Sequence, residues 1–441
     1  MSRAVFVVSS WLLLVSTVAG QEGEPSPPVA PEQATWPEPP FDAWVNADDV
    51  YLPPSASRMW PSVGLLRRGD VVRVARCVPS CDAPRAWAEL EPFGAARLLR
   101  LAPMPRPEAA VWEASHDPYV YARVQRGGAD AHVAPDPDSP VVEHHRTNDI
   151  LAFRTGDEAP EGWLRRPDGT YISLERVKPE TPSTFEGCHD PPPTFAFVRR
   201  QTPLVADDGT SRLVERYERF EVLGIEPDGR VRVPGGTLAR LDVRLGRRRD
   251  RDPRWPTDLR WIHIDLDQQV LTAYEGDRLI FATMVSTGRK RRATPEGFFS
   301  VRRKIWHTRM RGAGGSGDPY FVDQVPWVQY LTQSVALHGA FWHDRFGQQL
   351  SHGCINLAFA DARFLFEWSP PDIPEGWLAV HPAGAGLPSV RVRIERLERG
   401  FRPGSEVEVA AQAAPAPAVE PPAPVPAVAP PVTPPVDVPP P

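Results

Sequence analysis

Between residues 41 and 245 the chain repeats one pattern three times, and this repetition limits what the region can fold into more than any other feature. Each copy has a strand that begins with an aromatic residue, a turn rich in Pro or Asp, a short apolar strand, and a strand that alternates apolar with charged residues. Short alternating runs separated by turns predict small β-barrels or β-sandwiches. We therefore expect a first module over residues 41–106, a second over 117–180 and a third over 193–245.

The three segments resemble, in their pattern, bacterial domains of the Src-homology-three type, which often accompany cell-wall enzymes. The first segment reads "DDVYLPPSASRMWPSVGLLRRGDVVRVARCV" and the third "FAFVRRQTPLVADDGTSRLVERYERFEVLGI". The resemblance implies small β-barrels that contact wall glycan or protein. The alternative is that they are generic β-modules without a ligand.

Both ends of the chain differ in composition from the part between them. Arg3, the apolar run Ala4–Val15 and the small residues that follow predict a secretory signal peptide over residues 1–20, too short and wrongly flanked for a stable membrane span. An uncleaved anchor is the alternative. Residues 21–40 and 404–441 are rich in Pro and poor in bulky apolar residues, which predicts an extended linker and a disordered tail. We expect a secreted protein of the periplasm or cell envelope, with no membrane span after cleavage.

The cysteines matter because thiols tend to oxidise outside the cytoplasm. Cys77 and Cys81 are four residues apart, close enough to form a disulfide across a turn or hairpin. Cys188 and Cys354 remain; they could pair with each other, but a lone thiol in a secreted protein suggests a reactive one. The formal net charge of −6 over 441 residues argues against nucleic acid as a partner.

The region after the charged linker 246–254 predicts a second kind of domain. Alternating runs joined by tight turns indicate a mostly β-domain over residues 256–382, ending in a short strand at "WLAVHP". Residues 358–369, "AFADARFLFEWS", have apolar side chains at roughly helical spacing and predict one short helix. Residues 383–403 are expected to form a C-terminal extension.

The candidate chemistry lies in "ALHGAF" and "LSHGCINL", which place two His-Gly pairs near Cys354. A thiol is a useful nucleophile only as a thiolate, and a neighbouring imidazole can take its proton. His338 and His352 are both available for this purpose. Gly339 and Gly353 relieve backbone crowding, so that a substrate carbonyl can approach and N–H groups can converge on one oxyanion.

Two other interpretations of these residues remain open. The thiol could be structural and the two histidines incidental to it. Alternatively, His338, His343, His352 and Cys354 could bind zinc, although their spacings match no usual zinc pattern. We expect neither a metal nor a cofactor, and nucleophilic catalysis by Cys354 is the interpretation that explains all these residues together.

Two stretches resemble the YkuD-type L,D-transpeptidase family in its own order: "STGRKRRATPEGFFSV" and, downstream, "HGAFWHDRFGQQLSHGCIN". The resemblance covers about residues 256–382. It implies an L,D-transpeptidase-type β-sandwich with one short helix, in which Cys354 is the nucleophile and His338 the proton acceptor and donor. The Gly339 carbonyl would hold the His338 ring in its working tautomer.

The same resemblance assigns supporting roles around this pair. The backbone N–H groups of His352, Gly353 and Cys354 would stabilise the oxyanion, and Ser351 would form hydrogen bonds within the loop. The expected substrate-binding residues are Asn356, Trp342 and Tyr330. His343, in the loop between the two halves of the motif, could replace His338 as the base.

The resemblance implies remodelling of peptidoglycan stem peptides. Cys354 would be acylated by the third residue of a tetrapeptide stem with release of D-alanine, and transfer to an amine would form a 3–3 cross-link. The glycine-rich loop 312–318 could close the site against water. The alternatives are an L,D-carboxypeptidase or amidase that hydrolyses the same bond or detaches a wall-linked protein, and a non-catalytic wall-binding scaffold.

Overall fold

The computed structural model describes residues 36–57, 61–105, 119–154, 159–312 and 320–397. They form two compact units, one of residues 36–190 together with 249–395 and one of residues 191–248. The expected signal peptide, the Pro-rich tail, and most of linker 21–40 and of loop 312–318 lie outside these ranges. Within them, we find no helix with the length and apolar character needed to cross a membrane.

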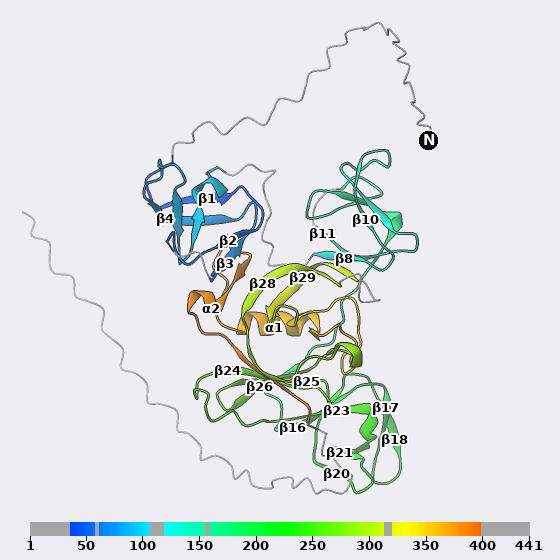
Figure 1. Cartoon of the computed structure of the whole chain (residues 1–441). Coiled ribbons are helices and arrows are strands. Elements are labelled where there is room, and N and C mark those ends of the chain that lie inside the picture. Colours follow the sequence, from blue (N-terminus) through cyan, green and yellow to red (C-terminus); the bar gives the residue numbers. More distant parts are fainter. Residues whose placement is uncertain (1–35, 58–60, 106–118, 155–158, 313–319, 398–441) are drawn as a thin grey trace, which may run out of the picture. The chain divides into compact units, whose positions relative to one another are not determined.

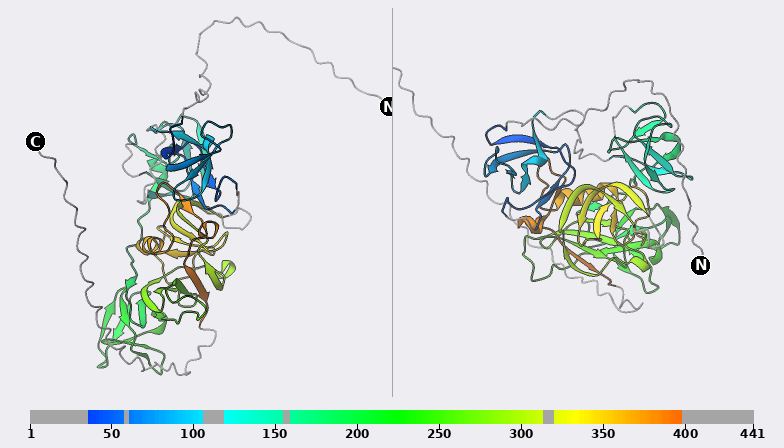
Figure 2. Two further views of the ribbon diagram at one scale, coloured as in Figure 1. Left: turned by 90° about the vertical axis from the view of Figure 1, so that its left-hand side faces the viewer. Right: turned by 45° about the horizontal axis from the view of Figure 1, so that its top comes forward.

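The fold is mostly β, as predicted, and strands make up every module (Figures 1 and 2). The longest helix among the described residues is α1 (Phe359–Trp368), which confirms the helix predicted over residues 358–369. Its side chains Ala362, Leu365 and Phe366 are buried, as their helical spacing requires. A second helix, α2 (Pro382–Ala385), is one turn long.

The first module contains one sheet with the strand order β6-β5-β4-β1-β7 and a separate hairpin, β2–β3. A disulfide joins Cys77, on β4, to Cys81. The strands are β1 (Phe41–Val45), β2 (Val50–Leu52), β3 (Gly64–Leu66), β4 (Val71–Val78), β5 (Trp87–Leu90), β6 (Ala95–Arg97) and β7 (Leu101–Pro103).

The first module also shares a sheet with the domain that follows residue 249. Strand β3 pairs with β32 (Ala379–Val380), which is the strand predicted at "WLAVHP". Trp377, just before β32, is buried in the hydrophobic core of the first module. The sequence predicted this strand but not its partner.

The second module is built from seven strands and also joins the larger unit. In it, β11 lies between β8 and β29 of the following domain, with Ile150 opposite Val322. The strands are β8 (Val120–Val124), β9 (Ala129–His132), β10 (Val141–His145), β11 (Ile150–Phe153), β12 (Trp163–Arg165), β13 (Tyr171–Ser173) and β14 (Val177–Pro179).

The third module forms a unit by itself, with a core of alternating residues such as Ala196, Val198 and Leu204. Its two sheets have the orders β19-β16-β23 and β18-β17-β22-β21-β20. The strands are β16 (Thr194–Val198), β17 (Thr202–Val205), β18 (Ser211–Val214), β19 (Arg219–Glu221), β20 (Gly224–Ile225), β21 (Val231–Val233), β22 (Gly236–Leu238) and β23 (Val243–Arg247).

The three modules share a local element that agrees with their repetition in sequence. In each, a short 3₁₀ helix directly precedes the last strand: Leu98–Arg100, Leu174–Arg176 and Arg240–Asp242. The assignment of the modules to the Src-homology-three type stays a prediction.

Two sheets and α1 form the domain that carries the Cys354 motif. One sheet has the order β15-β26-β25-β24-β33-β27; in the other, β28 and β30 lie on either side of β29, and β31 pairs with β30. The strands are β15 (Cys188–His189), β24 (Arg260–Asp265), β25 (Val270–Glu275), β26 (Arg278–Met284), β27 (Gly297–Ser300), β28 (Arg303–Arg311), β29 (Phe321–Tyr330), β30 (Ala336–Gly339), β31 (Ile355–Leu357) and β33 (Arg391–Glu395).

The main core of this domain lies between the two sheets and α1 (Figure 1). Ile262 on one sheet, Trp327 on the other and Leu365 on α1 belong to the same buried cluster. Strand β33 pairs in parallel with β24, and its Val392 and Ile394 are part of this core. The expected domain end at residue 382 is therefore too early, because the short β33 completes a sheet begun far upstream in the sequence.

Candidate active site

Two neighbouring parallel strands bring the candidate catalytic residues together. Strands β30 and β31 pair with His338 opposite Asn356, and Cys354 directly precedes β31. His338 and Cys354 line the same pocket, which has a volume of about 430 Å³. The residues between the two strands thus form the loop and return that join the halves of the motif.

The pocket draws its wall from the catalytic loop, from β29 and from the second module. From the domain around Cys354, the lining residues are Met310, Tyr320, Phe321, Val322, His338, Trp342, His343, Arg345, Leu350, Ser351, His352, Cys354 and Asn356. From the second module they are Arg123, Thr147, Asn148, Asp149 and Ile150.

The His338 imidazole is buried and held by one backbone group. Its Nδ1 lies 3.0 Å from the Gly339 carbonyl oxygen, which can only accept, so Nδ1 carries the proton and Nε2 is left as a proton acceptor. Burial lowers the pKa of His338 to about 4, because the charged ring loses its hydration. The ring is therefore neutral at neutral pH and able to take a proton.

The Cys354 thiol lies at the pocket with its own hydrogen bond. Its Sγ donates to the Ser334 carbonyl oxygen at 3.6 Å, and burial of the sulfur raises the pKa of the thiol. Cys354 and Cys188 are both free thiols. Among the described residues there is no hydrogen bond between this thiol and His338, so the resting pair consists of a neutral thiol and a neutral imidazole.

The loop before β31 is fixed by the Ser351 hydroxyl. This hydroxyl donates to the Cys354 carbonyl oxygen at 2.5 Å and accepts the Gly353 N–H at 3.1 Å. Gly353 has a φ of +124°, a conformation that favours glycine. Ser351 thus has the supporting position expected for it, whereas the Gly353 N–H, expected at the oxyanion, is bonded to Ser351.

The upstream stretch "STGRKRRATPEG" forms hydrogen bonds with this loop. The Thr294 hydroxyl donates to the Gly353 carbonyl oxygen at 2.8 Å and accepts the Gly288 N–H at 2.9 Å. Ser286 forms a β-bridge with Asn356, and the Ser351 N–H donates to the Thr287 carbonyl oxygen at 3.0 Å. These contacts explain why the two separated motifs occur together in the sequence.

His352 lies in a different environment from His338. Its Nε2 is 2.6 Å from an Arg289 guanidinium nitrogen, and its ring is 4.6 Å from the Tyr320 ring, centre to centre. The structure therefore brings both predicted histidines to the pocket but places only His338 on a strand paired with β31.

The expected substrate-binding residues are divided between the pocket and its surroundings. Asn356 and Trp342 line the pocket, and the Trp342 ring lies 5.7 Å from that of His338. Tyr330 is not one of the lining residues; its ring lies under the Arg303 guanidinium at 4.1 Å. The role of Tyr330 at the substrate stays a prediction.

This geometry gives little support to the two other interpretations of the pocket, His343 as the base and a zinc site. His343 accepts the Arg345 N–H at Nδ1, at 3.3 Å, and its Nε2 lies 3.0 Å from the Asn356 amide nitrogen. It therefore contacts Asn356, and its role as an alternative base stays a prediction. Nor do the described residues bring three His, Cys, Asp or Glu side chains together as ligands for a metal ion.

No sequence pattern pointed to the pocket residues in the second module. Arg123 and the segment 147–150 were assigned to a separate β-module, and nothing in local periodicity tells which distant segment faces a motif. Their position depends on the pairing of β11 with β29, a contact between parts far apart in the chain.

Comparison with known proteins shows what this domain is similar to. Residues 259–409 match the YkuD family model, described as the L,D-transpeptidase catalytic domain. The chain is 28% identical over 123 residues to the candidate L,D-transpeptidase YciB of Bacillus subtilis (strain 168). That match covers 26% of this chain and 61% of the relative, so the chain spans about three fifths of the length of the curated relative it matches.

Two solved structures are also similar. The catalytic domain of the E. faecium L,D-transpeptidase, solved by NMR, is 23% identical, with 31% of this chain and 98% of that chain covered and a TM-score of 0.25. An L,D-transpeptidase from Mycobacterium smegmatis is 17% identical, with 38% and 65% covered and a TM-score of 0.26. Both TM-scores are low.

Proposed function

We propose that this protein is a peptidoglycan-remodelling L,D-transpeptidase that uses Cys354 as its nucleophile. The observation that supports this most is that a domain of the YkuD family places Cys354 and a neutral, tautomerically fixed His338 at one pocket. We expect the chain to act in the periplasm or cell envelope on stem peptides, without a cofactor.

In the first half-reaction, a tetrapeptide stem acylates the enzyme. His338 Nε2 takes the thiol proton, and the Cys354 sulfur attacks the carbonyl carbon of the third residue. The C–S bond forms, the C–N bond to the terminal D-alanine breaks, and the imidazole gives its proton to the leaving amine. The backbone N–H of Cys354 is the proposed donor to the oxyanion, since that of Gly353 is bonded to Ser351.

In the second half-reaction, an amine from another stem attacks the thioester. The new C–N bond forms, the C–S bond breaks, and one amine proton returns to the sulfur through His338. An amine that arrives as ammonium also loses one proton to solvent. The product is a 3–3 cross-link, and attack by water instead would make the enzyme an L,D-carboxypeptidase.

The experiment that tests this proposal is the digestion of disaccharide-tetrapeptide by the mature chain, with products analysed by liquid chromatography and mass spectrometry. We expect cross-linked dimers and free D-alanine. The Cys354→Ala variant should lower both by roughly a thousandfold or more, because no other group replaces the nucleophile. The matched control Cys188→Ala should keep the activity of the unaltered protein.

The outcomes separate the candidate functions. Tripeptide without dimers would replace transfer by hydrolysis, and full activity of Cys354→Ala would contradict the assigned nucleophile. Absence of any product from the unaltered protein, combined with binding to purified sacculi, would favour the wall-binding scaffold.

A further inference from the structure

The second module lies against the pocket that contains Cys354. Arg123 from β8 and residues 147–150, the turn between β10 and β11, line this pocket together with His338 and Trp342. Arg123 also donates to the Trp342 carbonyl oxygen at 3.3 Å and forms an ion pair with Glu180 at 2.5 Å. A module that provides part of the pocket wall can take part in substrate recognition.

Aromatic and backbone contacts hold this module in place. The Tyr121 ring stacks on Phe341 with ring centres 3.5 Å apart, and its hydroxyl donates to the Gln324 carbonyl oxygen at 2.8 Å. Tyr121 is almost completely buried. Phe341 lies in the loop between the two halves of the motif, so the contact joins the module directly to the pocket.

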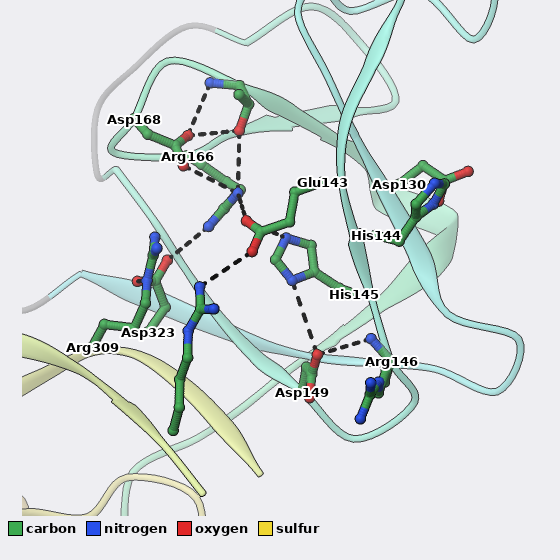
Figure 3. A network of polar contacts seen from close by, with 12 residues as sticks. Asp130, Glu143, His144, His145, Arg146, Asp149, Arg166, Asp168, Arg309 and Asp323 are labelled. Carbon is green, nitrogen blue, oxygen red and sulfur yellow. Dashed lines mark hydrogen bonds and ion pairs between the residues drawn. The ribbon is translucent and has the colours of Figure 1, made fainter. Parts of the chain in front are cut away.

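A network of charged residues also joins the second module to β28 and β29 (Figure 3). Arg166, whose side chain is fully buried, reaches Glu143 at 3.3 Å and Asp168 at 3.1 Å in its own module and Asp323 of β29 at 3.2 Å. Arg311 of β28 reaches Glu143 at 3.3 Å from the other side. The Arg166–Asp323 pair is buried on both sides, and removal of either partner would leave an uncompensated charge in the core.

Contacts with the same network hold the turn that lines the pocket. His145 lies next to Glu143 at 3.4 Å and to Asp149 at 4.0 Å, and the Arg146 N–H donates to the Asp149 carboxylate at 2.8 Å. Asn148 adopts a left-handed conformation, with a φ of +73°, that turns the chain at this point. The Asp149 carboxylate is thereby held at the pocket.

A positive group lines the pocket as well as this negative one. The Arg345 side chain is exposed, and its guanidinium has no hydrogen bond or ion pair within the described part of the chain. Asp149 and Arg345 therefore provide a carboxylate and an unpaired guanidinium in one pocket. Such a combination suits a ligand that carries both an ammonium group and a carboxylate.

The proposed reaction supplies such a ligand at one step. The leaving D-alanine carries an amine and a carboxylate on the same carbon, and an acceptor amine enters along the path by which the leaving amine departs. A donor peptide presents an uncharged amide and a carboxylate at the same place, so a carboxylate such as that of Asp149 favours the acceptor and not the donor.

We propose that the second module forms the acceptor side of this active site, with Asp149 binding the ammonium group and Arg345 the neighbouring carboxylate of an α-amino acid end. This subsite rests on the proposed function. It assigns the module to acceptor choice and not to wall binding at a distance.

The test compares two acceptors that differ only in their carboxylates: diaminopimelate and cadaverine. The full mature chain receives disaccharide-tetrapeptide as donor, and both D-alanine release and transfer to each acceptor are measured. Arg345→Ala should lower the preference for diaminopimelate over cadaverine by about tenfold or more, since a charged hydrogen bond to the carboxylate is lost. Asp149→Asn should raise the KM of both amines by about tenfold, since both arrive as ammonium ions.

Matched controls come from charged residues of the second module outside the pocket. Arg126→Ala and Asp138→Asn change exposed groups and should leave both KM values as they are. Thermal unfolding of each variant checks that it is folded. If Asp149→Asn does not fold, the ratio of transfer to diaminopimelate over transfer to cadaverine by Arg345→Ala decides the test.

The experiment distinguishes a wrong acceptor subsite from a wrong proposed function. Normal D-alanine release with unchanged acceptor preference and KM in both variants would overturn the acceptor subsite alone. An unaltered protein that releases no D-alanine and forms no acyl adduct on Cys354 would overturn the function and the subsite with it.

Discussion

At the scale of single residues, the chemistry depends on the protonation of His338. A buried imidazole with a pKa of about 4 is neutral when an ordinary histidine, with a pKa near 6.5, would already be half protonated. The fixed proton on Nδ1 leaves Nε2 to take the thiol proton. The site thus keeps its base available at mildly acidic pH.

This environment predicts the acid limb of the activity. As the pH falls through about 4, the ring becomes protonated and can no longer accept the thiol proton, so kcat/KM for D-alanine release should fall there. The pH profile of kcat/KM for the unaltered protein measures this limb. A limb near 6.5 would contradict the buried, neutral base, and His189→Gln, which changes a histidine outside the pocket, should keep the limb near 4.

The residues with a motif could be predicted from sequence and the others could not. Cys354, His338 and Asn356 lie at the pocket because their motif encodes a loop and two paired strands. Tyr330, which was also expected at the substrate, does not line the pocket, and the Arg303 guanidinium lies over its ring. Asp149 could not be assigned from sequence, because its position at the pocket depends on a contact between distant segments.

At the scale of elements, local patterns predicted strands and the helix but not their partners. The alternation around β32 and β3 is visible in the sequence, yet their pairing joins residue 64 to residue 380. Periodicity determines which face of a strand is buried, and it does not choose among many similar strands. For the same reason the sequence did not predict the pairing of β33, which completes a sheet begun by β24.

The pairing of β3 with β32 leaves no room for a side chain at residue 64. A Cβ on Gly64 would lie 2.3 Å from a ring carbon of Trp377 and 2.9 Å from the Ala379 carbonyl oxygen. Gly64→Ala should therefore lower the free energy of unfolding by roughly 1–3 kcal/mol, because the overpacked core must move. Urea unfolding followed by tryptophan fluorescence measures this change.

The control for this substitution is Gly224→Ala in the third module. A Cβ there meets nothing within 4 Å, and we expect a change within about 0.5 kcal/mol of zero. Equal stability of Gly64→Ala and the unaltered protein would show that Trp377 does not occupy the first module in solution.

At the scale of the whole molecule, buried histidines make stability depend on pH. Burial is the largest cause that lowers the pKa values of His145, His338 and His381 to about 4 each. Between about pH 6.5 and pH 4 the unfolded chain binds protons that the folded chain does not, so stability falls as the pH falls through this window. Asp149 and Asp265, whose pKa values are raised by burial, act in the opposite direction near the lower end.

We expect the free energy of unfolding, measured by urea titration, to fall between pH 6.5 and 4 with a slope of up to about 1.4 kcal/mol per pH unit for each buried histidine. His381→Gln should reduce this slope. The exposed His144, changed to Gln, should leave it as it is. Stability that is constant across this window would contradict the burial of these rings.

The docking of residues 119–180 against the catalytic loop also bears on how such a chain can evolve. If these residues select the acceptor, recombination that exchanges this segment would change the bond that the enzyme forms. The segment would then evolve together with residues 338–356. Residues 191–248 form their own compact unit, so we expect that their exchange leaves the chemistry at Cys354 as it is.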